Sequence, residues 1–480
     1  MILLESETYR TLPALSYSAI GLIAGSHGLP TFNAVVLATS SLFSLHINTI
    51  GFPTAIMQIL APSDTMKDII EKYRPDLKPF EETYRHLHQS PELSGQEKET
   101  AAIAADHLQS LGFEVHTHIG GHGVAGVLRN GEGPTVLLRA DMDALPVQEK
   151  TGLPYASTKT TKNADGVTMP VMHACGHDTH VASLMASALL LHSARAHWAG
   201  TLICIFQPAE EQLDGARAML EDGLYDKIPK PDVVLAQHVM RMKTGTVSVR
   251  AGRFLTAADA FDVRIFGRGG HGSAPHTCID PIVAGAAVVT KLQSIVSREV
   301  TPGEMAVVTC GSFQAGHAHN IIPDYCDLKL NVRTYDAATR KRIVASIHRI
   351  VEAECEAAGC VEKPVVKRTY STPATINDGK LVKALKGTFA DYFADGLVES
   401  EPAAASEDFS LLATAVGAPY VMWTFGGVDP DTWDDAVARD VVRELPNNHS
   451  PFFAPVIQPT LRTAVDAMAV GAMTFLNKKE

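Results

Sequence analysis

Three short apolar runs, each ending in a side chain that can bind a metal ion, constrain the fold of this chain more than any other feature. They are Thr135–Asp141, Thr201–Glu211 and Asp232–His238. Continuous apolar runs of this length are typical of strands that are buried on both faces of a parallel sheet. Open α/β sheets place their sites beyond the carboxyl ends of the strands. We therefore expect the last side chains of the three runs to meet at one edge of a sheet.

Thiol, imidazole and carboxylate side chains suited to zinc and similar divalent ions recur outside these runs as well. Cys175 and His177 lie in the string Met172–His180, and His449 lies in Asn447–Pro451. Each string alone is weak, because such residues are common without a metal. Their combination with strand ends that carry acid or imidazole indicates one shared metal site.

A second acid, Glu210, directly precedes the ligand-type Glu211. One carboxylate can hold a metal while its neighbour stays free to move protons. Hydrolysis by water that a metal activates requires this division of labour. The pair therefore favours a metal-dependent hydrolase.

The bulk composition narrows the class of protein. With 480 residues the chain exceeds the usual size of one hydrophobic core, so at least two domains are expected. A net charge of −12 and the lack of a Lys/Arg run argue against a nucleic-acid partner. The seven cysteines are too few and too scattered for a disulfide framework, which favours a reducing compartment such as the cytoplasm.

The first 63 residues differ from the rest, because positions 11–63 contain no Asp, Glu, Lys or Arg. A secretory signal needs a positive start, but Glu5 and Glu7 precede the first apolar stretch. Interruptions by Gly, Pro and polar residues speak against a clean membrane span. Three alternatives stay open: an extension outside the fold, an organelle or secretory address, and a membrane-associating segment.

The pattern of apolar and polar residues changes near position 256, and residues 256–370 are expected to form an inserted domain. Their order of elements is β-α-β-β-α-β, the split βαβ arrangement with a four-stranded antiparallel sheet and two helices on one face. The chain is accordingly divided into residues 1–63, residues 64–255 and 371–480 as the two parts of one catalytic domain, and the insert. The predicted elements of the insert are Ala257–Phe266, Pro281–Arg298, Met305–Phe313, Cys326–Tyr335, Ala338–Ala358 and Glu362–Tyr370.

Eight strings, in order along residues 66–476, together resemble the M20 metallopeptidase family. The resemblance is strongest to the amidohydrolase branch that contains hippurate hydrolases, N-acyl-amino-acid amidohydrolases and auxin-conjugate hydrolases. The first sixty-odd residues have no counterpart. The strings are Leu87–Ser94, Arg139–Pro146, Met172–His180, Gln207–Glu211, Gly267–His276, Asn320–Asp324, Ser406–Phe409 and Asn448–Pro451.

The resemblance implies an α/β catalytic domain with a central mixed sheet flanked by helices, and a ferredoxin-like α+β lid that mediates dimerisation. It implies two divalent metal ions per subunit, with Glu210 as general base. A thiolate ligand points to a borderline-soft ion, which leaves zinc and manganese open, with cobalt as a further candidate. The implied ligands are Cys175, His177, Glu211, His238 and His449.

Four further residues receive roles from the resemblance. Asp141 matches the acid that orients a metal ligand from behind, with a strand-end cap as the alternative. His271 is expected to stabilise the oxyanion in the partner subunit's site, the alternative being a solvated residue in a tight turn. Asn320 and Arg333 resemble the binders of the substrate carboxylate, and an ordinary surface ion pair is the alternative for Arg333.

The predicted activity is hydrolysis of the amide bond of N-acyl or aryl-acyl amino acids to a carboxylic acid and a free amino acid. The alternatives are a dipeptidase or carboxypeptidase with the same site, and a catalytically inactive metal-binding homologue. A mechanism with Cys175 as the nucleophile is a less favoured alternative, because residues of metal-ligand type surround this cysteine. The acyl group could meet Leu145, the segment Trp423–Phe425 or the loop Thr151–Pro170.

Overall fold

A computed structural model describes residues 65–163, 166–476 and 478. The predictions for residues 1–63 lie outside this range. Among the described residues, no helix is both long enough and apolar enough to cross a membrane.

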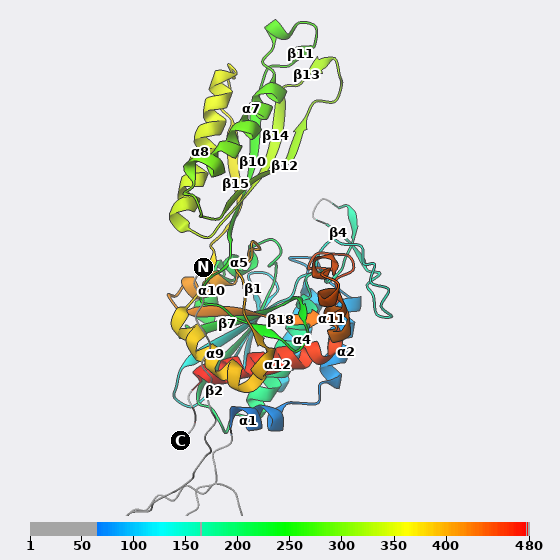
Figure 1. The fold of residues 1–480 in the computed structure, drawn as a ribbon, viewed down its shortest axis with the longest axis vertical. Coiled ribbons are helices and arrows are strands. Elements are labelled where there is room, and N and C mark those ends of the chain that lie inside the picture. The colour runs from blue at the N-terminus through cyan, green and yellow to red at the C-terminus, as the bar shows by residue number, and fades with distance from the viewer. Residues whose placement is uncertain (1–64, 164–165, 477, 479–480) are drawn as a thin grey trace, which may run out of the picture. The chain divides into compact units, whose positions relative to one another are not determined.

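An eight-stranded mixed sheet forms the centre of the part of the structure that lies outside residues 257–372 (Figure 1). Strands β6, β3, β7 and β18 run parallel in its middle, and antiparallel pairs adjoin them on both sides. This confirms the predicted central mixed sheet and the predicted parallel pairing of the three apolar runs. In spatial order the strands are β1 (Glu114–Ile119), β2 (Gly123–Asn130), β6 (Gly200–Gln207), β3 (Thr135–Asp141), β7 (Val233–Lys243), β18 (Tyr420–Val428), β8 (Val247–Ser248) and β17 (Leu397–Val398).

Helices cover both faces of this sheet, because its central strands bury alternate side chains in two separate cores. Val136 and Leu138 of β3 pack in one core, and Leu137 packs in the other. The first core contains α1 (Met66–Tyr73), α2 (Lys78–Gln89), α3 (Lys98–Ser110), α4 (His177–Ser193), α9 (Gly379–Phe393) and α12 (Ile457–Phe475). The second contains α5 (Gly215–Glu221), α6 (Leu224–Lys227) and α10 (Ser410–Thr414).

Residues 257–372 form a separate four-stranded antiparallel sheet with its own core. Both helices, α7 (Pro281–Ser294) and α8 (Ala337–Ala357), contribute to that core, as the β-α-β-β-α-β order predicts. The predicted helix 281–298 differs in detail, because its last turn is a π-helix over Ile295–Glu299. In spatial order the strands are β12 (Ala306–Ala315), β14 (Tyr325–Thr334), β10 (Ala257–Phe266) and β15 (Val365–Thr372).

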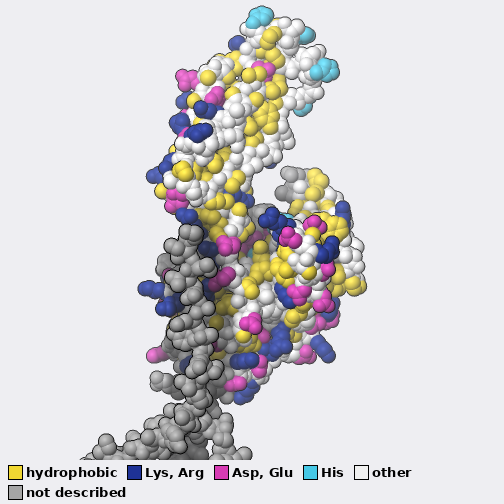
Figure 2. All heavy atoms as spheres, in the orientation of Figure 1, with side chains coloured by type: hydrophobic (Ala, Val, Ile, Leu, Met, Phe, Trp, Pro, Cys, Tyr) yellow, Lys and Arg dark blue, Asp and Glu magenta, His cyan; other side chains and the backbone are white. Residues whose placement is uncertain are grey.

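Short elements complete the fold. The Gly-rich loop after β10 contains β11 (Gly270–His271), which pairs with β13 (Ile321–Ile322). On the face drawn in Figure 2, acidic and basic side chains are interspersed. The remaining pieces are β4 (Thr160–Lys162), β5 (Thr168–Pro170), β9 (Gly252–Leu255), β16 (Thr375–Asn377), α11 (Pro430–Ala438) and the 3₁₀ turns Pro275–Thr277, Ala394–Gly396 and Val442–Glu444.

Candidate metal centre

The side chains predicted from separate strings converge at the carboxyl-terminal side of β3, β6 and β7, although His238 lies within β7, which continues to Lys243. The Sγ of Cys175 lies 3.5 Å from Nε2 of His238. Nε2 of His449 lies 3.3 Å from Oε1 of Glu211. One ligand atom each from Cys175, Glu211 and His449 lies within 4.8 Å of the other two, so these three side chains can share one ion.

His177 joins the same cluster from α4. Its Nε2 lies 3.9 Å from Oε2 of Glu210 and 3.9 Å from Oε1 of Glu211. Within the described residues, neither this nitrogen nor Oε1 of Glu211 has a hydrogen-bond partner, although both are buried. Buried polar atoms without partners are costly, and metal coordination is one way to satisfy them. The residues present therefore fit a bound cation.

Gly176 sets the geometry of the Cys175 and His177 pair. Its φ of 82° lies in the left-handed region, and a Cβ there would come within 2.5 Å of Val239. The Ala-, Leu- and Met-rich sequence predicts a helix over Val181–Ala194, but this glycine caps α4, and the helix already begins at His177, four residues earlier. The sequence did not indicate this start, because the first turn of the helix is polar and the apolar spacing that predicts a helix begins only after that turn.

A buried acid that the sequence analysis did not single out shapes the turn that carries Glu210. The Oε1 of Glu97 accepts hydrogen bonds from the backbone N–H groups of Gly95 and Ala209, each at 2.8 Å. Ala209 adopts a φ of 50°, which is uncommon for a residue with a side chain. Glu97 therefore stabilises the backbone immediately before the acid pair.

The loop that carries His449 is fastened to the ligand-bearing segments. The amide of Asn448 donates to the carbonyls of Cys175 at 3.2 Å and of Val239 at 3.1 Å. The backbone N–H of His449 donates to Ala174 O at 2.8 Å. Sequence reasoning quoted Asn448 in a motif but gave it no role, because these contacts join residues more than two hundred positions apart.

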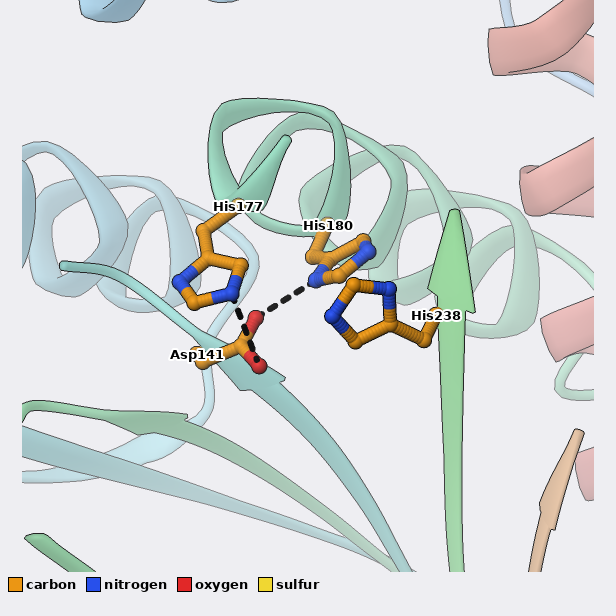
Figure 3. A group of neighbouring side chains, drawn as sticks. All are labelled: Asp141, His177, His180 and His238. Atoms are coloured by element: carbon orange, nitrogen blue, oxygen red, sulfur yellow. Dashed lines mark hydrogen bonds and ion pairs between the residues drawn. The ribbon is translucent and has the colours of Figure 1, made fainter. Parts of the chain in front are cut away.

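His180 lies beside His177 and His238 and contacts Asp141 (Figure 3), and both of its ring nitrogens have partners. Nδ1 lies 2.5 Å from Oδ1 of Asp141, and Nε2 accepts from the backbone N–H of Val239 at 2.9 Å. His238 differs, since its Nδ1 donates to the Val239 carbonyl at 2.7 Å and its Nε2 faces Cys175. Burial, then the charge of His180, holds the pKa of His238 well below its usual value, which favours the neutral form that binds metals.

Asp141 and Asp143 lie on opposite sides of His177. Oδ2 of Asp141 lies 3.6 Å from Nε2, the side that faces the cluster (Figure 3). Oδ1 of Asp143 lies 3.3 Å from Nδ1, the far side. Asp143 also accepts from Oγ of Ser94 at 2.6 Å and from the backbone N–H of Glu211 at 3.0 Å. The acid behind His177 is thus Asp143, which sequence reasoning missed although it lies two residues after the predicted Asp141.

A fully buried arginine, Arg139, connects Asp141 with a second acidic segment. Its guanidinium donates to Asp141 at 2.6 Å and to Glu407 at 2.7 Å. Burial opposes ionisation of Asp141, but the charges of Arg139 and the neighbouring histidines outweigh it and hold the pKa of Asp141 well below its usual value. Asp408 lies 3.5 Å from the same guanidinium. The string Ser406–Phe409 thus places two further carboxylates, Glu407 and Asp408, around Arg139.

The centre as a whole has an excess of negative charge. Burial, followed by the charges of Glu407 and Glu211, raises the pKa of Glu210 well above its usual value. Burial, followed by the charge of Glu211, likewise raises the pKa of the Cys175 thiol. A divalent cation would offset this charge and stabilise the thiolate, as it does in known thiolate sites.

A cavity of about 1030 Å³ opens over the centre. Its lining includes Cys175, Glu210, Glu211, His238 and His449. Arg333 also lines it, and its guanidinium donates to Ser406 Oγ and, at 2.9 Å, to the side-chain oxygen of Asn331.

His271 and Asn320 are exposed and are not among the residues that line the cavity of their own chain. The structure thus unites the five predicted ligands, Glu210, Asp141 and Arg333, but not these two.

This chain resembles known proteins over most of its length. Residues 137–440 match the model of peptidase family M20/M25/M40. The hippurate hydrolase of Campylobacter jejuni is 41% identical over 336 residues, which cover 69% of this chain and 84% of that protein.

The chain belongs to the M20 peptidase family. A second M20-type relative, the N-acyl-L-amino acid amidohydrolase of Geobacillus stearothermophilus, is 38% identical over 299 residues, covering 62% of this chain and 77% of that protein. A solved M20 structure from Bacillus subtilis, described as a dinuclear metal-binding peptidase, matches with a TM-score of 0.65 at 29% identity. The match covers 84% of this chain and 98% of that one. Membership of the M20 family makes this chain a metal-dependent amide hydrolase.

Proposed function

We propose that this M20 enzyme hydrolyses the amide bond of N-acyl or aryl-acyl amino acids, releasing a carboxylic acid and a free amino acid. One observation carries the proposal: a buried acid, Glu210, lies on the lining of a large cavity beside side chains that can hold a metal ion. The hippurate and N-acyl amino acid substrates named for the two relatives support the same substrate class.

Cys175, His177, Glu211, His238 and His449 would hold two divalent ions, zinc, manganese or cobalt. When bound, these ions would polarise the scissile carbonyl and lower the pKa of water. The thiol of Cys175 lies near both His238 and the Glu211–His449 pair, so it would be one of the groups that hold the metal.

Glu210 acts as general base. It lies on the cavity lining, where its carboxylate can accept a proton from the attacking water and return that proton to the departing amine nitrogen. Arg333 faces the same cavity and would bind the carboxylate of the amino acid. Both of its contacts, Asn331 and Ser406, are neutral, so its charge is free to pair with a substrate.

His271 and Asn320 complete the site from the partner subunit of a homodimer in this proposal. Both are exposed on or beside the β11–β13 pair and absent from the cavity of their own chain, which supports a role in trans. There His271 would stabilise the developing oxyanion. The seven cysteines are free thiols, in keeping with a cytoplasmic location.

A substrate screen tests the function. The full chain is assayed after loading with Mn²⁺ or Zn²⁺ and, as a control, after removal of metal by a chelator. Substrates are N-acetyl, N-benzoyl, indole-acetyl and long-chain acyl amino acids, beside dipeptides. We expect metal-dependent release of the free amino acid from acyl substrates. Cleavage of dipeptides alone would favour the peptidase alternative, and no turnover by fully metallated protein would favour the inactive homologue.

A further inference from the structure

The large cavity extends well beyond the metal centre along one direction of the sheet. Four of its lining residues, His238, Thr424, Ser248 and Val398, come from four neighbouring strands, β7, β18, β8 and β17. They are direct register partners: Thr424 pairs with His238, Ser248 with Thr424, and Val398 with Ser248. They therefore form one continuous row across the sheet.

We call the part of the cavity that lies along this row the arm, and the row sets its length. Neighbouring strands lie about 4.8 Å apart, so the three steps from His238 to Val398 span roughly 14 Å. A benzoyl group would occupy only the part of this arm nearest the metals. The arm thus has room for an acyl group considerably longer than an aromatic ring.

The walls of the arm suit methylene groups. Met242, Met422 and Leu255 line the cavity, and thioether side chains adapt to ligands of varied shape. The hydroxyl groups of the row are already satisfied, since Oγ of Ser248 and Oγ1 of Thr424 lie 2.7 Å apart. No polar group of a substrate is needed to satisfy them.

The charged residues at the far end of the arm also have partners. Glu399 pairs with Lys386 at 3.0 Å, and Glu401 lies 3.6 Å from Arg250. A second charge on the substrate would have no free counter-ion there. The apolar part of the lining thus suits an acyl chain, and the charged side chains Glu399 and Glu401 lie exposed to solvent at its far end.

We propose that this arm is the subsite for unbranched, apolar acyl chains of about ten carbons, so that medium- to long-chain N-acyl amino acids are the preferred substrates. The proposal rests on the function proposed above, and it assigns Val398 and Met242 as determinants of chain length. Val398 marks the end of the arm, and Met242 lies beside Thr424, whose hydroxyl donates to its sulfur at 3.5 Å.

The test measures binding separately from turnover. The metal-loaded Glu210→Gln protein is titrated with N-acetylglycine, N-hexanoylglycine and N-decanoylglycine below their micelle concentrations. Burial of a methylene group contributes about fourfold in affinity, so we expect N-decanoylglycine to bind on the order of 100-fold more tightly than N-acetylglycine even with partial burial. Equal affinity for the three ligands would overturn the proposal.

Variants in the same background locate the subsite. Val398→Phe should shorten the arm, and Met242→Glu should place a charge midway along it, so each should lower the decanoyl-to-acetyl affinity ratio at least tenfold. The matched control is Val361→Phe, because Val361 is 88% exposed and lies outside the cavity lining. An unchanged ratio in both arm variants would refute the assignment. Turnover of N-benzoylglycine by the wild-type enzyme, measured in parallel, reports separately whether the proposed function itself fails.

Discussion

At the scale of single residues, the candidate metal centre contains two kinds of side chain. Some are candidate metal ligands, and others hold these ligands in place. His177 faces the cluster through Nε2, while Asp143 faces its Nδ1. Asn448 fixes the backbone around Cys175. Supporting contacts of this kind set the orientation and basicity of metal ligands.

Replacing Glu210 by Gln should abolish most turnover without loss of metal. The variant keeps the shape of the side chain but cannot accept the proton, and removal of a general base costs on the order of 10²–10⁴ in rate. Elemental analysis and kcat are measured together. The control is Glu221→Gln, an exposed acid at the end of α5. Activity close to wild type would remove Glu210 from the mechanism.

Replacing Asp143 by Ala should weaken metal binding about 10- to 100-fold, because His177 and the backbone of Glu211 both lose their support. Affinity is measured by competition with a chelator. Asp143→Asn keeps one acceptor oxygen and should restore part of the affinity. Full metal affinity in the alanine variant would show that Asp143 does not support the ligands.

Cys175 should react with thiol reagents only after metal has been removed. A metal-bound thiolate is protected from alkylation, and the sulfur lies beside Nε2 of His238 in a buried position. Labelling is followed by mass spectrometry with and without chelator, and Cys278, which is partly exposed, reports reagent activity in both samples. Equal labelling rates at Cys175 would contradict its role as a ligand.

At the scale of elements, the parallel strands deliver their functional groups in different ways: Asp141 is the last residue of β3, His238 lies within β7, and Glu210 and Glu211 lie in the turn that follows β6. The turn after β6 depends on Gly215, where a Cβ would lie 1.6 Å from the carbonyl oxygen of Pro208, and on Glu97 at the start of α3. This turn carries Glu210 and Glu211. Its stability is therefore coupled to the ionisation of Glu97.

Glu97 should make the metal-free protein less stable as pH rises. Burial, followed by the charge of Asp143, raises the pKa of Glu97 from 4.5 to about 7. Between these values the folded protein keeps a proton that the unfolded chain releases, so the free energy of unfolding falls with rising pH. The full cost, on the order of 3 kcal/mol, is reached above pH 7.

Urea unfolding of the apo-protein between pH 4.5 and 8 measures this effect. Glu97→Gln should unfold with a free energy that falls less over this range than that of the wild type. Glu99→Gln, an exposed acid in the first turn of the same helix, is the control and should follow the wild type. Parallel profiles for wild type and Glu97→Gln would disprove the coupling.

At the scale of the whole molecule, the central question is whether one chain forms a complete site. The cavity of the described chain includes Arg333 but neither His271 nor Asn320. An antiparallel sheet with helices on one face leaves surface that can pair with a second copy about a two-fold axis.

Complementation tests the shared site. Inactive His271→Ala and inactive Glu210→Gln proteins are mixed under conditions of subunit exchange. A heterodimer contains one site with both residues intact, so activity should return to at most about half of the wild-type value per dimer. Absence of recovery despite demonstrated exchange would mean that His271 does not act in trans.

The sequence by itself was enough to predict most of the elements and to select candidate metal-binding side chains. The runs that became β3, β6 and β7 and the order of elements in residues 257–372 could be predicted, because apolar periodicity is a local property. The candidate metal ligands could also be recognised in the sequence, because thiol, imidazole and carboxylate side chains are the groups that bind such ions.

Only the tertiary structure decided which groups support the ligands and how far the cavity extends. Asp143 was missed because its role depends on the side of His177 that it faces, and Asn448 because its partners are remote in sequence. Among the segments considered for the acyl group, Trp423–Phe425 contributes Thr424 to the cavity lining. The row that Thr424 forms with Ser248 and Val398 exists only through strand register. Register and loop packing arise from contacts over hundreds of residues, which no local pattern encodes.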